Sequence, residues 1–261
     1  MTDSDKAKSP AQMLARLVLL FAVGIALSFG TPYVLRAIGA GAWAKQAFGP
    51  GGFYELYIAA GFASVLIAVM VQWHAGPGRA FQELGIGDLA LRGCAVCGAA
   101  IAVAVAILLY AGAKYQSAQS ADIVLFGLVG PFVEEVLFRG YLFRQARRWA
   151  GAPFLLAALA SSLLFGANHF DQGDSLADSF MNAAITFGGG VLFCWLVERW
   201  NSIWPGFVVH AGLNVAWTLY TLGDNAVGGS MGNIARLAVI LVAIGGTLAL
   251  TWRPRSVLAS G

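Results

Sequence analysis

Eight apolar segments, each 18 to 22 residues long and separated by short polar connections, run along almost the whole chain. Roughly 20 apolar residues in a helix span the hydrocarbon core of a bilayer, so each segment has the length of a transmembrane helix. Hydrophobic residues make up 59% of the chain and charged residues only 11%, a composition that cannot cover the surface of a soluble domain. We therefore predict an all-α fold, a polytopic transmembrane helical bundle of about eight helices. The predicted spans are 13–31, 54–73, 93–112, 122–143, 152–169, 180–197, 203–220 and 233–251.

The sequence reads as one domain, because no internal repeat, low-complexity tract or long linker divides it. We expect a single transmembrane domain over residues 13–251, with a motif core at 122–220 and cytoplasmic tails at 1–12 and 252–261. The segment 142–149 mixes bulky apolar residues with three arginines. It is expected to lie along the cytoplasmic interface, with the arginines as anchors, namely Arg144, Arg147 and Arg148.

Lysine and arginine are distributed unevenly between the two sets of connections. With the N-terminus inside, eleven of these residues fall on the cytoplasmic side and four on the outer side. The eleven are Lys6, Lys8, Arg16, Arg79, Arg92, Arg144, Arg147, Arg148, Arg199, Arg253 and Arg255, and the four are Arg36, Lys45, Lys114 and Arg236. Cytoplasmic loops of membrane proteins carry such an excess, so we expect both termini in the cytoplasm. Because these charges flank the membrane, the expected partner surface is the lipid bilayer and no nucleic acid is expected.

The first apolar segment allows a second interpretation. Ala26-Leu27-Ser28 loosely resembles the small-residue cleavage site of a signal peptide. A retained first helix fits the even number of helices and the charge distribution better, so we keep this segment in the predicted bundle.

The fourth apolar segment contains three ionisable residues, Glu134, Glu135 and Arg139. A charged side chain in the middle of a membrane helix costs about 2.5–3.5 kcal/mol or more unless it faces a protein interior or a wet cavity. Neighbours on a helix point about 100° apart, whereas residues four apart share a face. The spacing therefore favours a structural pair of Glu135 and Arg139, although Arg139 could also reach Glu134. In the favoured pairing, Glu134 is free to act as a general base that activates water.

Two histidines and an asparagine add polar groups to the following apolar segments. His210 and Asn214 are four residues apart, so they present an imidazole and an amide to the same cavity. At about 1.5 Å of rise per residue, Glu134 and His210 reach compatible depths. His169 comes out near the outer surface if its helix begins at Ala152. Either that helix begins later and is tilted, or the polar chamber extends outward.

The order and spacing of these polar residues resemble a known family. The matching motifs are E-E-x-x-x-R, F-x-x-x-H and H-x-x-x-N, represented here by Glu134-Glu135-Val-Leu-Phe-Arg139, Phe165-Gly-Ala-Asn-His169 and His210-Ala-Gly-Leu-Asn214. They are signatures of the CAAX-protease and bacteriocin-processing family of intramembrane endopeptidases, also called the ABI family. Residues 81–87 look like a segment that often precedes the third helix in its bacterial members. The resemblance thus implies an integral, multi-pass protein of a bacterial inner membrane.

The resemblance also implies a helical membrane protease with a polar intramembrane chamber. In the mechanism proposed for the family, the first glutamate, here Glu134, activates water with help from the first histidine, here His169. His210 and Asn214 would stabilise the oxyanion. A hydrogen-bond donor placed where negative charge develops is worth about 10²–10³ in rate, and an asparagine side chain can be a donor but not a base. The expected substrate is a membrane-associated peptide or protein.

Metal dependence is an open alternative, because family members have also been described as metalloproteases. Glu134, His169 and His210 could ligate zinc and leave one position open. No H-E-x-x-H motif is present, however, and the three residues would have to converge from separate helices. We therefore expect no cofactor and keep zinc as the alternative.

Two other classes of function would also keep polar residues in the membrane. A catalytically silent membrane scaffold or immunity-type regulator could use the same fold to bind a partner. An ion-coupled or proton-coupled transporter would need intramembrane carboxylates, but the sequence shows no obvious halves with matching interrupted helices. The intact set of three motifs favours the peptidase.

The charge distribution gives a topology that can be tested directly. Reporter fusions are expected to place both termini in the cytoplasm and the connection at 170–179 on the outer side, because the basic residues bias the connections in that sense. An external C-terminus would contradict the eight-helix arrangement.

Overall fold

The computed structural model describes residues 9–49, 51–220 and 229–251, and within these ranges the regular structure is helical with no strand. The predicted all-α bundle is therefore confirmed. The α-helices are α1 (Pro10–Ile25), α2 (Thr31–Ala37), α3 (Ala40–Phe48), α4 (Gly52–Trp73), α5 (Pro77–Glu83), α6 (Leu91–Tyr110), α7 (Ser120–Asp122), α8 (Gly130–Glu135), α9 (Phe154–Ala167), α10 (Leu176–Trp200), α11 (Trp204–Leu219) and α12 (Gly229–Thr251).

Wider π-helical turns join several of these helices into longer ones. Ala26–Gly30 connects α1 to α2, and Ile123–Val129 connects α7 to α8. Val136–Phe143 and Ala146–Ala150 continue α8, so residues 120–150 form one unbroken helical run, which we name the motif helix. Single π-helical turns inside α-helices are found frequently at functional sites.

Among the described residues, six helices are long and apolar enough to cross a membrane. They are Pro10–Ala37, Gly52–Trp73, Leu91–Tyr110, Phe154–Gln172, Leu176–Trp200 and Gly229–Thr251. The other two predicted spans, 122–143 and 203–220, are also helical. The first is interrupted by Glu134, Glu135 and Arg139, and α11 is only 16 residues long. The chain thus forms an integral membrane bundle in which all eight predicted segments are helices.

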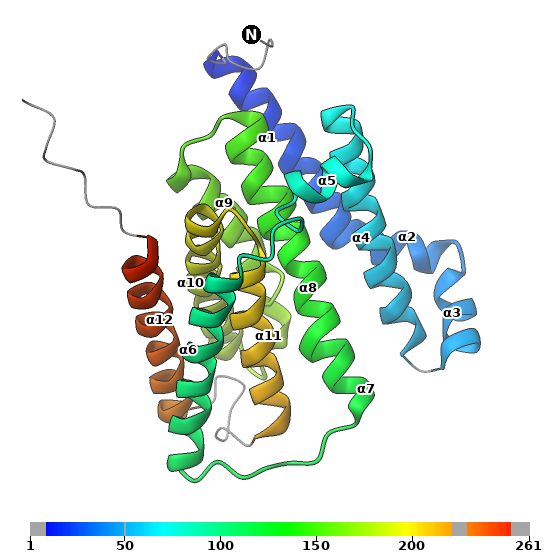
Figure 1. The fold of residues 1–261 in the computed structure, drawn as a ribbon. Helices are drawn as coiled ribbons and strands as arrows, with labels where there is room; N and C mark the ends of the chain where they lie inside the picture. The colour runs from blue at the N-terminus through cyan, green and yellow to red at the C-terminus, as the bar shows by residue number, and fades with distance from the viewer. Residues whose placement is uncertain (1–8, 50, 221–228, 252–261) are drawn as a thin grey trace, which may run out of the picture.

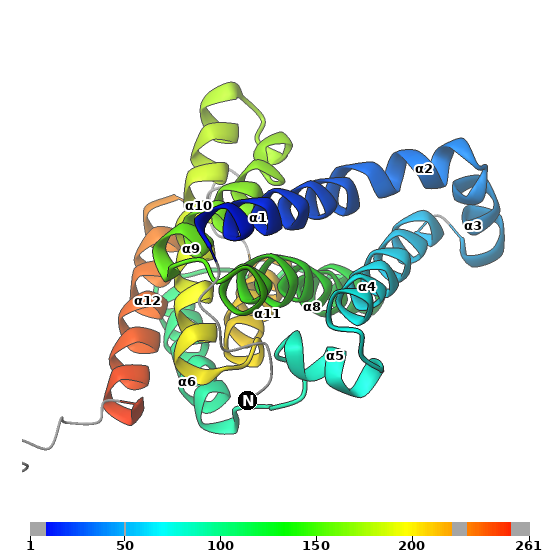
Figure 2. The ribbon, with the colours of Figure 1, turned by 90° about the horizontal axis from the view of Figure 1, so that it is seen from above.

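The motif helix runs through the middle of this bundle (Figures 1 and 2). It contacts α1, α4, α9, α10 and α11, and every residue from Val136 to Phe143 is buried. On one side, α6 lies between α11 and α12, while on the other side α2 and α3 reach away from the bundle with the start of α4 (Figure 2). The central place of the motif helix allows its polar residues to face protein on all sides, which is what lowers the cost of a charge in a membrane helix.

Helix capping corrects the predicted start of the first span. The structure begins α1 at Pro10, inside the expected tail 1–12. The Ser9 hydroxyl accepts from the Gln12 backbone N–H and the Gln12 side chain accepts from the Ser9 N–H, a reciprocal cap that fixes the helix start. Residues 1–8 and 252–261 of the two expected tails lie outside the described residues.

In the segment 142–149, the expected role of Arg144 as an exposed interfacial anchor is wrong. These residues continue the motif helix, and Arg144 is 4% exposed. Its guanidinium donates to the backbone carbonyls of Glu83 at 3.0 Å and Gln82 at 3.2 Å. Arg148 lies 3.2 Å from the Glu83 carboxylate. The short helix α5, which the prediction left as a connection, supplies these partners and so binds arginines that the sequence alone assigns to the membrane surface.

Candidate active site

The two neighbouring glutamates of the motif helix have different surroundings. The Glu135 side chain is completely buried, whereas 31% of the Glu134 side chain is exposed. Arg139 Nη1 lies 3.1 Å from Glu135 Oε1, the four-residue pair that the spacing favours. Glu134 makes no ion pair with Arg139 among the described contacts. Arg139 therefore pairs with Glu135, and Glu134 faces a cavity.

Arg139 is held between aromatic rings in a fully buried position. Its guanidinium carbon lies 4.0 Å from the centre of the Phe165 ring and 4.9 Å from that of Phe193. A cation over a desolvated aromatic face gains about 2 kcal/mol or more, which offsets part of the cost of burying the charge. These rings come from α9 and α10, so Arg139 joins the motif helix to both.

Glu135 also holds one of the histidines. Its Oε1 atom lies 3.0 Å from His210 Nδ1, and because a carboxylate can only accept, the Nδ1–H donates. His210 Nε2 consequently faces the other way, 3.7 Å from Glu134 Oε2. The sequence indicated the pair with Arg139 but not this second contact, since His210 comes from α11, 75 residues further along the chain.

His169 also reaches Glu134. Its Nδ1 atom lies 2.8 Å from the Phe165 backbone carbonyl, to which it donates, and its Nε2 lies 3.8 Å from Glu134 Oε2. The helix α9 begins at Phe154 and ends at Ala167, and the chain turns at His169. The structure thus begins α9 two residues later than Ala152 and brings His169 to Glu134, while the alternative of a chamber that extends outward stays open.

Two phenylalanines shape the surroundings of the histidines. The Phe165 ring packs edge-on against His169 at 4.7 Å, and the Phe193 ring stacks on His210 at 5.7 Å. Packing on both rings restricts how the imidazoles can turn. Phe165 carries a sequence signal, since it is the first residue of F-x-x-x-H, whereas Phe193 has none and is recognised only from the structure.

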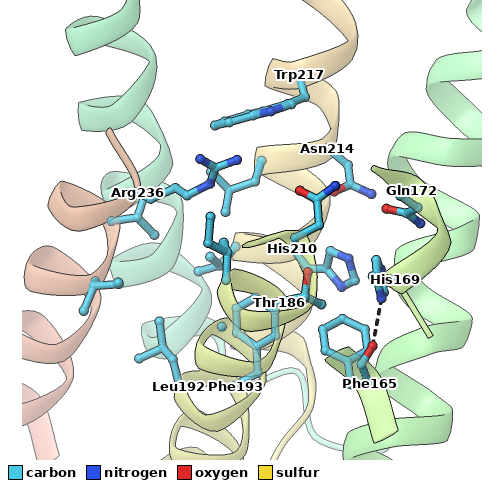
Figure 3. A pocket seen from close by; sticks show the side chains of 17 residues that line it. Phe165, His169, Gln172, Thr186, Leu192, Phe193, His210, Asn214, Trp217 and Arg236 are labelled. Carbon is cyan, nitrogen blue, oxygen red and sulfur yellow. Dashed lines mark hydrogen bonds between the residues drawn. The ribbon is translucent and has the colours of Figure 1, made fainter. Parts of the chain in front are cut away.

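Asn214 lies one helical turn beyond His210 on α11. Its Nδ2 atom donates to the Phe126 carbonyl at 3.2 Å, and the side chain lines the same cavity as His169 and His210 (Figure 3). No contact between Asn214 and Glu134 is among the described interactions. Because an amide nitrogen carries two N–H groups, the bond to Phe126 leaves the second one for another acceptor.

Two cavities meet at these residues. One of about 260 Å³ lies among α10, α11 and α12 and is lined by His210, Asn214 and Arg236, with the guanidinium of Arg236 over the Trp217 ring (Figure 3). The other, of about 350 Å³, lies between α4 and the motif helix and is lined by Glu134. His169 and Gln172 line both cavities. These two residues therefore lie at the boundary between the two cavities.

The donor types at the site suit zinc, but their arrangement does not form a metal site. Two imidazole nitrogens and a carboxylate surround one point, and each histidine holds its second nitrogen on an acceptor, as metal ligands do. Within residues 9–49, 51–220 and 229–251, however, no group of three His, Cys, Asp or Glu side chains is placed to hold a metal ion. The roles below are therefore derived from the protein groups alone.

Fold and site together define a class: a multi-pass helical membrane protein with a glutamate and two histidines gathered at a cavity inside the bundle. The family model "Type II CAAX prenyl endopeptidase Rce1-like" matches residues 116–216, which contain all three motifs. The resemblance predicted from the motifs is therefore confirmed, and the match covers the segment that builds the site.

A curated relative points to the same class. The protein described as "Putative membrane peptidase YdiL" from Bacillus subtilis (strain 168) is 30% identical over 92 residues, which are 35% of this chain and 34% of the relative. The chain thus matches about a third of the relative's length. No solved structure matches the chain. Family and relative together support a membrane peptidase of the CAAX type.

The buried pair predicts a larger loss of stability on replacement of one partner than a surface pair does. Arg139→Leu leaves the Glu135 carboxylate buried without its cation, and breaking a buried pair costs about 3–5 kcal/mol. The partly exposed pair of Arg147 and Glu198 offers a control, because Glu198→Gln breaks a pair of the surface type, worth about 0–1 kcal/mol, and leaves the bond from Arg147 to the Ala152 carbonyl in place. Thermal or denaturant unfolding in detergent measures both variants.

The same measurement tests the division between the glutamates. Glu135→Gln is expected to lower stability as well as activity, since it removes the charge that holds Arg139. A fully stable but inactive Glu135→Gln protein, together with an active Glu134→Gln protein, would reverse the roles assigned to the two glutamates.

Proposed function

We propose that this chain is an intramembrane endopeptidase that hydrolyses a peptide bond of a membrane-associated peptide or protein with water activated by Glu134. The observation that carries the proposal is the position of Glu134 Oε2, which lies 3.7 and 3.8 Å from the Nε2 atoms of His210 and His169 beside a cavity inside the bundle. A water molecule placed there meets a carboxylate that can accept its proton and imidazoles that can orient it.

The reaction needs a base at the nucleophile and donors at the developing negative charge. Glu134 takes a proton from water, and the oxygen adds to the carbonyl carbon of the peptide bond. His169 assists by holding the water, because its Nδ1–H is fixed on the Phe165 carbonyl and its Nε2 faces Glu134. The C–N bond then breaks, and the proton held by Glu134 passes to the departing amine.

His210 and Asn214 are suited to the oxyanion. Both line the cavity on the far side of Glu134 from α4, and the second N–H of the Asn214 amide is a donor. His210 is proposed to donate there through Nε2, with its ring held at Nδ1 by the Glu135 carboxylate. Donors fixed in advance by the protein stabilise the transition state without reorganisation.

The position of the site indicates the kind of substrate. It lies inside a bundle whose outer helices present apolar side chains, such as Leu163, Leu237 and Leu241, to their surroundings. A peptide anchored in or at the bilayer reaches such a site more readily than a soluble one. The bacterial inner membrane as location, with both termini in the cytoplasm, belongs to the same proposal.

Replacement of the proposed base tests the proposal against a silent scaffold. Glu134→Gln keeps the shape and removes the basic carboxylate, so it should abolish cleavage of membrane peptides in proteoliposomes with little loss of folding. His210→Ala and Asn214→Ala should each lower the rate about 10²-fold or more through lost oxyanion stabilisation. Glu198→Gln is the control, because Glu198 pairs with Arg147 away from the site. A scaffold or regulator would tolerate all of these changes.

Metal content tests the chemistry separately. We expect protein stripped of metal to keep its cleavage activity, because the proposed mechanism uses Glu134 as the base and needs no resident ion. Elemental analysis of gently purified protein and assays with strong chelators measure this directly. Near-stoichiometric zinc, loss of activity with a chelator and recovery with added zinc would contradict the metal-free mechanism.

A further inference from the structure

Tyr54 places a phenol beside the motif helix, one turn before Glu134. It projects from α4 into the cavity of about 350 Å³ that Glu134 also lines. A Cβ atom built on Gly130 would lie 2.8 Å from the Tyr54 hydroxyl oxygen, so only a residue without a side chain lets the phenol approach this closely. The Tyr54 ring also packs on Phe126 with centroids 5.0 Å apart, which fixes its direction.

The backbone conformation at residue 130 does not require glycine. Gly130 has φ −56°, an ordinary helical value that alanine adopts with a lower free energy. Glycine in a helix interior destabilises by about 1 kcal/mol relative to alanine. The absence of a side chain at Gly130 therefore serves to make room for the Tyr54 hydroxyl.

The neighbouring tyrosine on α4 behaves differently. The Tyr57 hydroxyl donates to the Ser28 carbonyl at 3.2 Å and so ties α4 to the first helix. In the part of the chain that the structure describes, the Tyr54 hydroxyl forms no hydrogen bond with protein and faces the cavity instead. Both tyrosines line the cavity that Glu134 lines, but the Tyr57 hydroxyl is held by the Ser28 carbonyl, whereas the Tyr54 hydroxyl has no such partner among the described residues.

We propose that Tyr54 is a further catalytic residue, whose phenolic O–H donates a hydrogen bond to the water that Glu134 activates. This role rests on the proposed peptidase function. The water oxygen accepts from Tyr54, one water hydrogen goes to Glu134, and the remaining lone pair points at the carbonyl carbon. Tyr54 keeps its own proton throughout, because the proton of the water passes to Glu134. It orients the nucleophile, as a donor on the opposite side from His210 and Asn214.

Removal of the hydroxyl gives the primary test. In proteoliposomes with a cleaved membrane peptide, Tyr54→Phe is expected to lower kcat about 10–100-fold, the size of effect that a misplaced reactant produces. KM should change less than about threefold, because the substrate itself does not lose a contact. Tyr57 lines the same cavity, but its hydroxyl is bound to the Ser28 carbonyl, so Tyr57→Phe is the matched control and should lower the melting temperature rather than kcat.

A second variant tests the position of the phenol rather than its presence. Gly130→Ala adds a Cβ that pushes the Tyr54 hydroxyl away, so it should lower kcat about tenfold in the wild-type background. Added to Tyr54→Phe, which has no hydroxyl to displace, it should lower kcat less than about threefold further. Such non-additivity is the signature of a shared contact, which a general loss of folding would not produce.

The outcomes separate this role from the proposed function. A Tyr54→Phe protein with unchanged kcat, a change confined to KM, or additive effects of the two variants would overturn the role of Tyr54, while inactivity of Glu134→Gln would still support the peptidase. Failure of the wild-type protein to cleave any membrane peptide would overturn both.

Discussion

The buried contact between Arg139 and Glu135 holds the site together. Glu135 Oε1 meets both Arg139 Nη1 at 3.1 Å and His210 Nδ1 at 3.0 Å, so one carboxylate oxygen positions a cation and an imidazole. Arg139 in turn lies 4.0 Å from the centre of the Phe165 ring, whose residue accepts from His169 through its carbonyl. The ion pair thus orients His210 directly, and Phe165 links it to His169.

This arrangement explains why two adjacent glutamates have separate tasks. Glu135 is completely buried and accepts contacts from Arg139 and His210, so its role is structural. Glu134 is partly exposed and faces the cavity. A buried ion pair is seldom a net source of stability, because desolvation of two charges offsets their attraction. Here the ion pair serves to orient His210, because it sets the direction in which His210 Nε2 points.

A second polar network fixes the other end of the same helices. Gln145 is fully buried and donates to the carbonyls of Glu83 and Gly140, and Arg144 donates to Glu83 and to Asn201 Oδ1. The Trp204 indole N–H at the start of α11 donates to the Ile86 carbonyl, and its ring stacks on Phe132 of the motif helix at 5.5 Å. These contacts hold α11 and the motif helix in register, and therefore keep His210 level with Glu134.

The parts of the site that the sequence predicts are those that depend on the spacing of residues along one helix. The length and apolarity of the segments predict the helices, and the four-residue spacing predicts the pair of Glu135 and Arg139, because both depend on neighbours along one helix. Contacts between helices carry no such signal. The packing of Phe193 on His210 and the approach of Tyr54 to Gly130 depend on how separate helices meet, and so they appear only in the structure.

The errors of prediction have the same origin. Arg144 looked like an interfacial anchor because the sequence does not show that α5 folds back over it. The sequence also could not bring His169 to Glu134, because their contact depends on how the end of α9 meets the motif helix. In each case a local pattern was correct, and the tertiary contact that redirects it was missing.

Nitrogen NMR of protein labelled with ¹⁵N at histidine tests the central claim most directly, because it reports which ring nitrogen of His210 carries a proton. The chain has three histidines, His74, His169 and His210, so replacing one at a time assigns the signals. If Glu135 orients His210, its Nδ1 must be protonated and hydrogen-bonded in the folded protein at neutral pH, and this signal must change in Glu135→Gln while it persists in Glu134→Gln. A His210 ring that carries its only proton on Nε2 would contradict the account.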